Sequence, residues 1–409
     1  MKSTVLSCFS GVGGLDLGLE YAGFDTIGCL EINRDAREAL AANRPRWSLL
    51  EPFDVIEAGR TLKPSDVGMV PGELTLIAGG PPCQPFSMAA QWAAPRPGIM
   101  DARGTAVGGM LQLVRSFLPA VVMMENVAGF LSGRNNAAPV IEAAFEEINA
   151  VSGTGYRLGC WIVDAADYGV PQNRKRAIVL AFRDGHEILG SLPASHKGIH
   201  RTAWDALGDH APEVPPVALG KYADLLPSIP EGFNYQYLTA RGAGPDREVF
   251  GYRTKYWSFL LKLAKDRPAW TLPASPGPST GPFHWDNRPL SALEMLLLQG
   301  FPPSWKLVGS ERASVRLAGN ATPPPLAEAI GRIVLSVLEH PESKIEPVDI
   351  KPVLAVARRD VPAPPPAEPS PLPPRWAALV GPRKAHPGPG YGPSPHPVFE
   401  RDAIEEGAS

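Results

Sequence analysis

Short, mostly apolar runs alternate with helix-like segments over the first 180 or so residues of the chain. The runs have the length of buried strands and occupy residues 5–9, 24–30, 74–78, 120–124 and 177–182. Between the first two, residues 15–21 repeat apolar positions at helical spacing. The pattern predicts an open α/β sheet, in which the carboxyl ends of the strands hold the chemistry.

A glycine turn follows the first predicted strand, in the sequence Phe9-Ser10-Gly11-Val12-Gly13-Gly14. Such a turn lets backbone approach a ligand closely. The second strand ends on Glu31, a carboxylate placed to accept hydrogen bonds from ribose hydroxyls. The third glycine of the dinucleotide fingerprint is missing, and Phe9 offers a ring that can stack on an adenine. This opening predicts a nucleotide site and disfavours a dinucleotide oxidoreductase.

Cys83 lies in a proline-rich turn directly after the third predicted strand, in Gly80-Pro81-Pro82-Cys83-Gln84-Pro85-Phe86-Ser87. A stiff turn at the end of a strand holds the thiol outward at the edge of the sheet. A free cysteine is more often buried and inert. Because prolines, Gln84 and Ser87 surround this cysteine rather than an apolar run, we interpret it as a nucleophile.

Two further strands bring charged side chains to the same edge. The run 120–124 leads into Glu125, and a carboxylate there is costly unless it is hydrogen-bonded or used, although it could also cap the following helix. Arg174 and Arg176 stand at alternate positions before the run 177–182 and share one side of an extended segment. They could form a solvated face or point at an anionic or carbonyl-rich ligand.

These motifs, in this order, resemble those of the C5-cytosine methyltransferases, which use S-adenosylmethionine. The resemblance runs from Val5 to about Leu338 and includes the final block Gly319-Asn320-Ala321-Thr322. It implies a Rossmann-like methyltransferase sheet with a second, smaller target-recognition lobe. The cofactor-binding residues that it implies are Phe9, Ser10, Gly11, Gly13, Gly14, Glu31, Ile32, Asp54, Val55, Gly80, Pro82, Asn320 and Ala321.

The resemblance also implies a covalent mechanism. The Cys83 thiolate adds to C6 of cytosine, so that C5 becomes nucleophilic enough to take a methyl group. Glu125 hydrogen-bonds the N3 and amino edge of the ring, Arg176 reaches O2, and Arg174 lies near the same pocket, where it could lower the pKa of the thiol. A stacked base cannot be reached in this way, so the target cytosine must be flipped out of the duplex.

Composition changes after the last of these strands. Residues 186–226 are irregular and rich in Pro, Gly and Ala, which predicts a catalytic domain over 1–185, a recognition lobe over 186–287 and a return segment over 288–340. Interleaved basic and aromatic residues in the lobe suit contacts to DNA. The predicted DNA-binding residues are Gln84, Ser87, Arg103, Arg241, Arg247, Arg253 and Lys255. In an alternative interpretation, Tyr256, Trp257, Phe259 and Leu260 form the core of the lobe.

Two segments have compositions that suggest little fixed structure. Residues 341–409 are proline-rich, which predicts a disordered tail that buries no core, although Trp376 with Arg375 and Arg383 could bind a partner. Residues 86–103 contain alanine pairs, Pro95, Pro97 and Gly98, which predicts a lid that closes over the flipped base.

The overall composition adds few constraints. The chain has 409 residues, a formal net charge of −3, and 4 cysteines without Cys-x-x-Cys spacing, so neither a disulfide framework nor a metal site is predicted. Without a signal peptide or membrane span, we expect a cytoplasmic monomer that joins the nucleoid when bound to double-stranded DNA. Family analogy suggests a separately encoded restriction endonuclease as its partner.

Two alternatives to a DNA methyltransferase stay open. The related transfer-RNA methyltransferases use the same active site, but they typically carry a Cys-Phe-Thr triplet that this chain lacks. A catalytically silent DNA-binding relative, or a plain nucleotide-binding protein, is disfavoured because Cys83, Glu125 and Arg176 are all present.

Overall fold

The computed structural model describes residues 3–82, 105–132, 136–186, 190–252, 256–341 and 344–381. Several residues with a predicted function lie outside this part of the chain: Cys83, Gln84, Ser87, Arg103, Arg253, Lys255 and Arg383, together with the predicted lid at 86–103.

A six-stranded sheet forms the centre of the predicted catalytic domain, here called the catalytic half. Its strands are β1 (Thr4–Cys8), β2 (Asp25–Leu30), β3 (Leu76–Gly79), β4 (Val121–Val127), β5 (Arg157–Asp164) and β6 (Lys175–Phe182). They are arranged in the order β2-β1-β3-β4-β6-β5, with the first four parallel and β6 antiparallel to both its neighbours. The α/β class is therefore confirmed. The apolar-run analysis missed β5, because this edge strand is only partly buried and its sequence is not continuously apolar.

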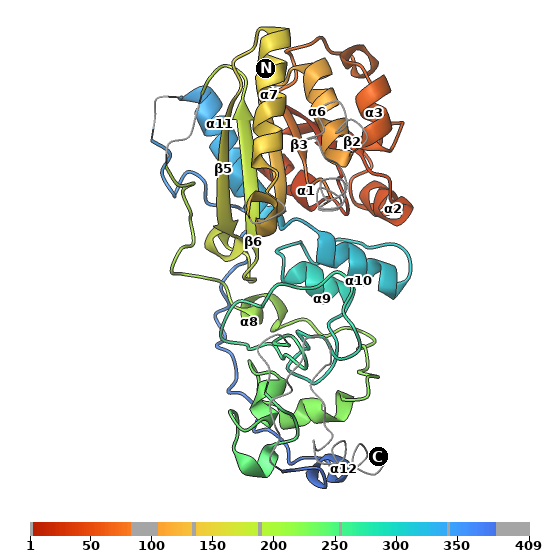
Figure 1. Ribbon diagram of the computed structural model, residues 1–409, viewed down its shortest axis with the longest axis vertical. Helices are drawn as coiled ribbons and strands as arrows, with labels where there is room; N and C mark the ends of the chain where they lie inside the picture. The colour runs from red at the N-terminus through yellow and green to blue at the C-terminus, as the bar shows by residue number, and fades with distance from the viewer. Residues whose placement is uncertain are drawn as a thin grey trace, which may run out of the picture.

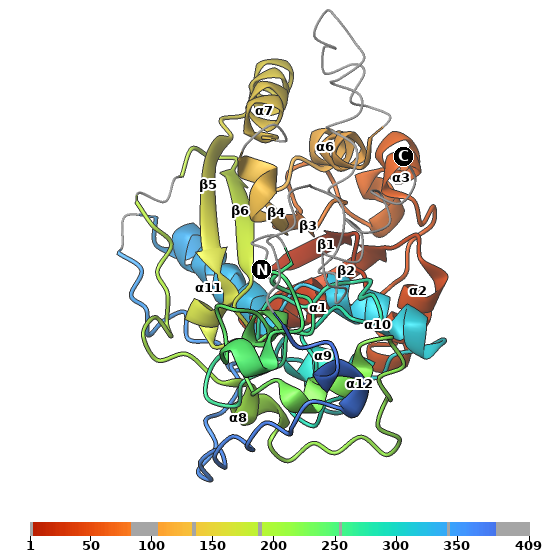
Figure 2. The ribbon, with the colours of Figure 1, turned by 60° about the horizontal axis from the view of Figure 1, so that its bottom comes forward.

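Helices cover both faces of the sheet (Figures 1 and 2). One face packs against α3 (Val55–Thr61), α6 (Ala106–Phe117) and α7 (Ala138–Ser152), and the other against α1 (Gly14–Ala22) and α11 (Pro324–Glu339). The helix α2 (Arg34–Asn43) joins a third cluster with α9 (Ala292–Leu297) and α10 (Glu311–Asn320). The α1 and α11 backbones approach closely, since a Cβ on Gly18 would lie 2.4 Å from the Pro324 carbonyl oxygen. The C-terminal part of the chain thus completes the fold that the N-terminal part begins.

The predicted recognition lobe contains little regular structure and has a core of its own. After β6 come α8 (Ala203–Leu207), three short 3₁₀ helices (Ala223–Ser228, Tyr235–Leu238 and Pro245–Arg247), α9 (Ala292–Leu297) and α10 (Glu311–Asn320). Further 3₁₀ helices in the catalytic half span Pro64–Val67, Ala128–Leu131 and Ala165–Tyr168. The core of the lobe consists of Leu225, Leu226, Ile229, Tyr235, Leu238, Val249, Phe250, Leu260, Phe283 and Trp376.

The aromatic residues of the lobe divide between its core and its surface. Leu260 is a buried core residue, and Phe259 and Tyr256 pack against that core. The core interpretation is therefore confirmed for these three residues. Trp257 differs, because 45% of its surface is exposed.

Residues 344–381 depart from the expectation of an unpacked tail. Their backbone is mostly irregular, as the proline content predicts, but it runs from the end of α11 along the length of the molecule to the short helix α12 (Pro374–Ala377) in the lobe (Figure 1). Ile350 is fully buried in the cluster that the sheet forms with α1 and α11. Trp376 is 3% exposed and belongs to the lobe core. The physical reason is that backbone groups and single large side chains hold this segment, which composition alone does not reveal. Among the described residues, no helix has the length and apolar character needed to cross a membrane.

Candidate active site

A cavity of about 650 Å³ opens at the carboxyl ends of the parallel strands. Its size lies in the usual range for sites that bind small molecules. Twelve of the residues predicted from sequence to act in catalysis or cofactor binding line it: Phe9, Ser10, Gly11, Glu31, Ile32, Gly80, Pro82, Glu125, Arg174, Arg176, Asn320 and Ala321. The structure thus gathers residues from both ends of the chain around one space.

The glycine turn after β1 shapes one wall of the cavity. Gly11 and Gly13 have φ values of 54° and 85°, and even Phe9 has a positive φ of 58°. Such left-handed conformations suit glycine and are uncommon for other residues. Gly14 has a different role: a Cβ there would lie 2.0 Å from the Thr322 carbonyl oxygen. This position therefore has to be glycine for the return segment to close the cavity.

Glu31 fixes the loop between β2 and α2. Its Oε2 accepts a hydrogen bond from the Gly11 amide at 2.7 Å, and its Oε1 accepts one from the Asn33 amide at 2.7 Å. The neighbouring Ile32 side chain is 68% exposed although it is apolar, and it lines the cavity together with Phe9. An exposed apolar side chain beside a ring and a carboxylate can hold a nucleoside, with the base on the apolar groups and the ribose hydroxyls at Glu31.

Four residues of the predicted cofactor set lie outside the lining of this cavity. Gly13 is the N-cap of α1 and Gly14 is the first residue of that helix. Asp54 caps α3 and accepts a hydrogen bond from the Ile56 amide at 2.9 Å, while the Val55 side chain is buried in the core. Contact between a nucleoside and Asp54 or Val55 stays a prediction.

Glu125 and Arg176 meet at the centre of the cavity. The Arg176 Nε lies 2.7 Å from Glu125 Oε1, and the Thr322 hydroxyl donates to Glu125 Oε2 at 3.2 Å. Both charged side chains are less than one-tenth exposed. Arg176 also donates to the Lys175 carbonyl oxygen at 2.8 Å. A buried carboxylate held in this way presents a fixed hydrogen-bonding edge to any ligand that enters.

Arg174 ties the return segment to the sheet. Its Nη2 donates to the carbonyl oxygens of Gly319 at 3.0 Å and Ala321 at 3.1 Å, and its own side chain is 3% exposed. Burial, together with the nearby charge of Arg176, lowers the pKa of the Arg174 guanidinium to about 9, against the opposing effect of Glu125. Arg174 remains charged at neutral pH and acts as a clamp on the segment that carries Asn320.

The loop that leads into Cys83 is anchored to β4. The Asn126 Nδ2 donates to the Pro81 carbonyl oxygen at 2.8 Å, and Gly80 lies close enough to Glu125 that a Cβ would be 3.3 Å from its Oε2. Residues 80–82 therefore lie beside the carboxylate, although Cys83 itself is outside the described part of the chain.

Asp16 lies in the first turn of α1, directly after the glycine turn, and is fully buried. It accepts hydrogen bonds from Ser7, Ser10 and the Cys29 thiol, whose sulfur is 3.5 Å from Oδ1. Burial raises the pKa of Asp16 to about 6 despite these hydrogen bonds. Within the described residues, no group of three or more His, Cys, Asp or Glu side chains is arranged to hold a metal ion.

The two described cations predicted to bind DNA lie away from the cavity. Arg241 is exposed, with its guanidinium carbon 4.0 Å from the centre of the Tyr252 ring. Arg247 is partly buried, and its Nη1 lies 3.3 Å from the Ser370 carbonyl oxygen. Contact of these two residues with DNA stays a prediction.

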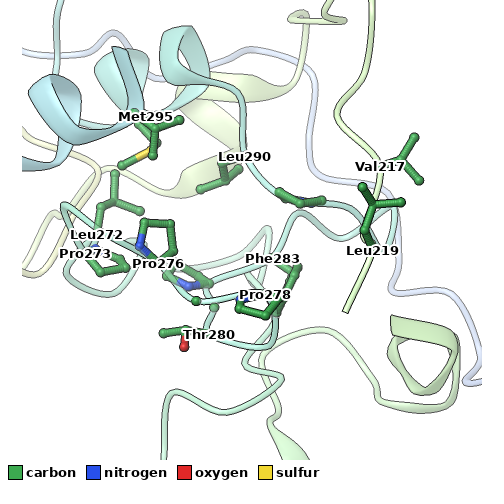
Figure 3. A pocket seen from close by; sticks show the side chains of 15 residues that line it. Val217, Leu219, Leu272, Pro273, Pro276, Pro278, Thr280, Phe283, Leu290 and Met295 are labelled. Carbon is green, nitrogen blue, oxygen red and sulfur yellow. The ribbon is translucent and has the colours of Figure 1, made fainter. Parts of the chain in front are cut away.

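A second cavity, of about 240 Å³, lies between the lobe and α9 (Figure 3). Figure 3 shows Val217 and Leu219 on one side of it and Met295, Leu272 and Pro273 on the other. None of its described lining residues has an ionisable side chain, so these residues offer no group for acid or base chemistry. The larger cavity is therefore the candidate active site.

The lining residues that were not predicted from sequence include Thr322, Asn126 and Thr271. Thr322 stands in the block Gly319-Asn320-Ala321-Thr322 and Asn126 follows Glu125, so both were next to predicted residues. Their hydrogen bonds join residues that are 197 and 45 positions apart, which no local pattern indicates. Thr271 lines the cavity from the lobe side, and nothing in its neighbourhood marks it.

Comparisons with known proteins identify the family of the chain. The sequence model of the C-5 cytosine-specific DNA methylase family matches residues 3–336. The chain is 31% identical over 387 residues to the type II methyltransferase M.SacI of Streptomyces achromogenes, covering 83% of this chain and 94% of that protein. It is 32% identical over 359 residues to the type II methyltransferase M.Eco47II of Escherichia coli, covering 82% and 79%.

A solved methyltransferase structure is also similar to this chain. It is described as a DNA modification methyltransferase encoded within an E. coli prophage, and it superposes with a TM-score of 0.56 at 26% identity, covering 82% of this chain and 99% of that one.

Proposed function

Since the chain belongs to the C-5 cytosine-specific DNA methylase family and is a DNA cytosine-5-methyltransferase of the restriction-modification type, we propose that it methylates C5 of a cytosine flipped out of double-stranded DNA through a covalent adduct with Cys83. The observation that carries this proposal is the buried pair of Glu125 and Arg176 beside residues 80–82, which lead into Cys83. A carboxylate and a guanidinium beside the segment that leads into a cysteine suit the polar edge of a cytosine and attack at its C6.

The cavity also fits the methyl donor of this family, S-adenosylmethionine. Glu31 offers a carboxylate to the ribose hydroxyls, Phe9 and Ile32 offer apolar surface to the adenine, and the turn at Gly11 lets backbone approach the ligand. When bound, the donor supplies an electrophilic methyl group. In our proposal the residues of this chain orient it and exclude water from it.

The proposed reaction begins at Cys83. Its thiolate forms a bond to C6, which places electron density on C5, and the new C5–CH₃ bond forms as the S–CH₃ bond of the donor breaks. The C5 proton then passes to a base, the C6–S bond breaks, and the thiolate leaves with its electron pair. The C5=C6 double bond is thereby restored.

Glu125 and Arg176 stabilise the cytosine during thiolate addition in this scheme. Glu125 accepts a hydrogen bond from the amino group and passes a proton to N3, which neutralises the negative charge that thiolate addition places on the ring; N3 returns this proton when the C6–S bond breaks. Arg176, already at hydrogen-bonding distance from Glu125, donates to O2. Thr322 holds the other oxygen of Glu125 and so fixes the plane of its carboxyl group.

A transfer-RNA substrate is the alternative. The relatives M.SacI and M.Eco47II are both named type II methyltransferases, which favours DNA modification and a cognate restriction endonuclease. Bisulfite sequencing of plasmid DNA from a host that expresses the chain tests this choice and identifies the recognition site. Methylated cytosines at one sequence are expected; unmodified plasmid together with methylated transfer RNA would contradict the proposal.

Replacement of the thiol tests the covalent step. Cys83→Ala is expected to lose the denaturant-stable adduct with a duplex that carries 5-fluorocytosine at the target, and to retain less than about a tenth of wild-type turnover, or about 1.4 kcal/mol of barrier. Cys160→Ala is the matched control, because Cys160 is an exposed thiol on β5. Turnover by the Cys83 variant at the wild-type rate would contradict covalent catalysis.

A further inference from the structure

The chain first enters the recognition lobe after β6. Residues 344–381, here called the strap, lead from the catalytic half into the lobe again. We propose that the strap is a working part of the recognition lobe and positions the segment 235–250 for DNA binding. This inference rests on the proposed function, because it assumes that the lobe binds DNA. The strap lies beyond residues 3–336, the part matched by the family model, so the family match does not account for it.

The first anchor of the strap is a buried carboxylate on α11. Glu328 is fully buried, and its oxygens accept hydrogen bonds from the backbone amides of Val353 at 2.7 Å and Leu354 at 2.9 Å. Arg332 on the same helix donates to Glu328 as well. A buried carboxylate with charged and backbone donors is a strong and directional anchor. The strap therefore leaves the catalytic half at a fixed position.

The second anchor is α8, at the start of the lobe. The Arg359 amide donates to Asp205 Oδ1 at 3.0 Å, the Arg359 guanidinium forms an ion pair with Asp209, and Trp204 Nε1 donates to the Val361 carbonyl oxygen at 2.9 Å. Upstream, Arg201 Nε donates to the Val356 carbonyl oxygen at 2.6 Å. The strap thus runs beside the chain that enters the lobe, and the two segments support each other.

The third anchor lies inside the lobe core. The Trp376 ring is 5.6 Å from the Tyr222 ring and 6.4 Å from the Phe250 ring, measured between centroids. Its Nε1 donates to the Asp224 carboxylate at 3.0 Å, and the Arg375 Nη2 lies 2.6 Å from the same carboxylate. A core built mainly from irregular segments gains much of its stability from a large buried ring of this kind. Trp376 is therefore an integral part of the lobe core.

The strap also touches the segment that carries the predicted DNA contacts. The Gly381 amide donates to the Glu248 carbonyl oxygen at 3.1 Å, and the Arg247 guanidinium reaches the Ser370 carbonyl oxygen at 3.3 Å. Tyr235 and Phe250, at the ends of this segment, belong to the same core as Trp376. Loss of the strap would release the segment from two sides without touching the cofactor cavity.

Kinetics on cognate DNA test the proposal. We would compare the full chain, a chain ending after Pro362, Trp376→Ala and Trp376→Phe, with a chain ending after Gly381 as the matched control. The first truncation keeps the first two anchors and removes the third. For it and for Trp376→Ala, we expect KM for DNA to rise about 10-fold or more, with kcat and the Kd for S-adenosylhomocysteine within about twofold of the full chain. Trp376→Phe, which keeps an aromatic ring in the core, and the chain ending after Gly381 should behave like the full chain.

Duplex binding, followed by fluorescence anisotropy, separates this inference from the proposed function. Cognate affinity and discrimination against a scrambled duplex should fall in the same two variants. A full chain that binds DNA without methylating it would overturn the function alone, and one that does neither would overturn both. Equal DNA affinity and KM in all variants would overturn the positioning role of the strap. So would a parallel loss of S-adenosylhomocysteine binding, because the strap would then support the whole fold.

Discussion

Arg176 and Glu125 face each other across adjacent antiparallel strands, with the arginine Nε 2.7 Å from the glutamate Oε1. Arg176 pairs in register with Val127, so the two charges lie where β4 and β6 reach the cavity. Both side chains are less than one-tenth exposed, and each compensates the charge of the other. Removal of one partner would leave the other buried and uncompensated, which is costly. The pair therefore holds the Glu125 carboxyl group in a nearly buried part of the cavity, where a ligand can reach it.

Thr322 is predicted to act through Glu125. Thr322→Val removes the hydroxyl that donates to Glu125 Oε2 at 3.2 Å, while keeping a similar volume. We expect the single-turnover rate of methyl transfer to fall about 10-fold, or about 1.4 kcal/mol, with the cofactor Kd unchanged. Thr322→Ser keeps the hydroxyl and should restore the rate. A valine variant as fast as wild type would show that Glu125 needs no such support.

Asn126 is predicted to hold the loop that carries Cys83. Asn126→Ala removes the hydrogen bond to the Pro81 carbonyl oxygen. Formation of the adduct with 5-fluorocytosine DNA should slow by about 10-fold, because the thiol is less well placed for attack. Cofactor binding, measured by calorimetry on the same sample, serves as the internal control. Loss of both properties together would indicate a damaged fold instead of a misplaced loop.

Many of the polar and charged residues of the cavity could be predicted from sequence because they stand at the ends of buried strands. The carboxyl ends of parallel strands share one edge, so Glu31, residues 80–82 and Glu125 meet there once the strands are recognised. Arg174 was also found, but its observed partners, the carbonyl oxygens of Gly319 and Ala321, are backbone atoms far away in sequence. No pattern of side-chain types predicts such contacts.

The position of the strap, in contrast, could not be predicted from sequence. Its proline content correctly predicts an extended backbone, yet its position depends on Glu328, α8 and one tryptophan. These contacts have no periodicity, because they occur at single points along an irregular chain. Asp54 also shows that a sequence motif leaves the role of a residue open. Its carboxylate, which resembles a ligand-binding acid, caps α3.

Arg174 is predicted to control cofactor affinity through the return segment. Lysine carries one ammonium group, so in Arg174→Lys it cannot reproduce the guanidinium geometry that reaches both the Gly319 and Ala321 carbonyl oxygens. The cofactor Kd should rise about 10-fold, because Asn320 lies between these two residues and lines the cavity. Arg312→Lys, at an exposed position of α10, is the matched control. Equal affinities in calorimetry would show that the segment holds its place without Arg174.

Asp16 is predicted to make stability depend on pH. Its pKa is raised from 3.8 to about 6 by burial, so between these values the folded chain holds a proton that the unfolded chain has lost. The free energy of unfolding contributed by this group therefore falls as pH rises through that window, and the loss is complete above about pH 7. Asp16→Asn cannot ionise and lacks this dependence.

Urea unfolding of both proteins at pH 4.5, 6 and 7.5 measures the effect, these values being chosen to span about the range of the titration. The difference in unfolding free energy between Asp16→Asn and wild type should shift in favour of the variant by about 2 kcal/mol across this series. Only the change with pH matters, since the substitution also alters the hydrogen bonds with Ser7, Ser10 and Cys29 by a constant amount. Parallel curves for the two proteins would mean that Asp16 titrates in the folded chain as it does in the unfolded one.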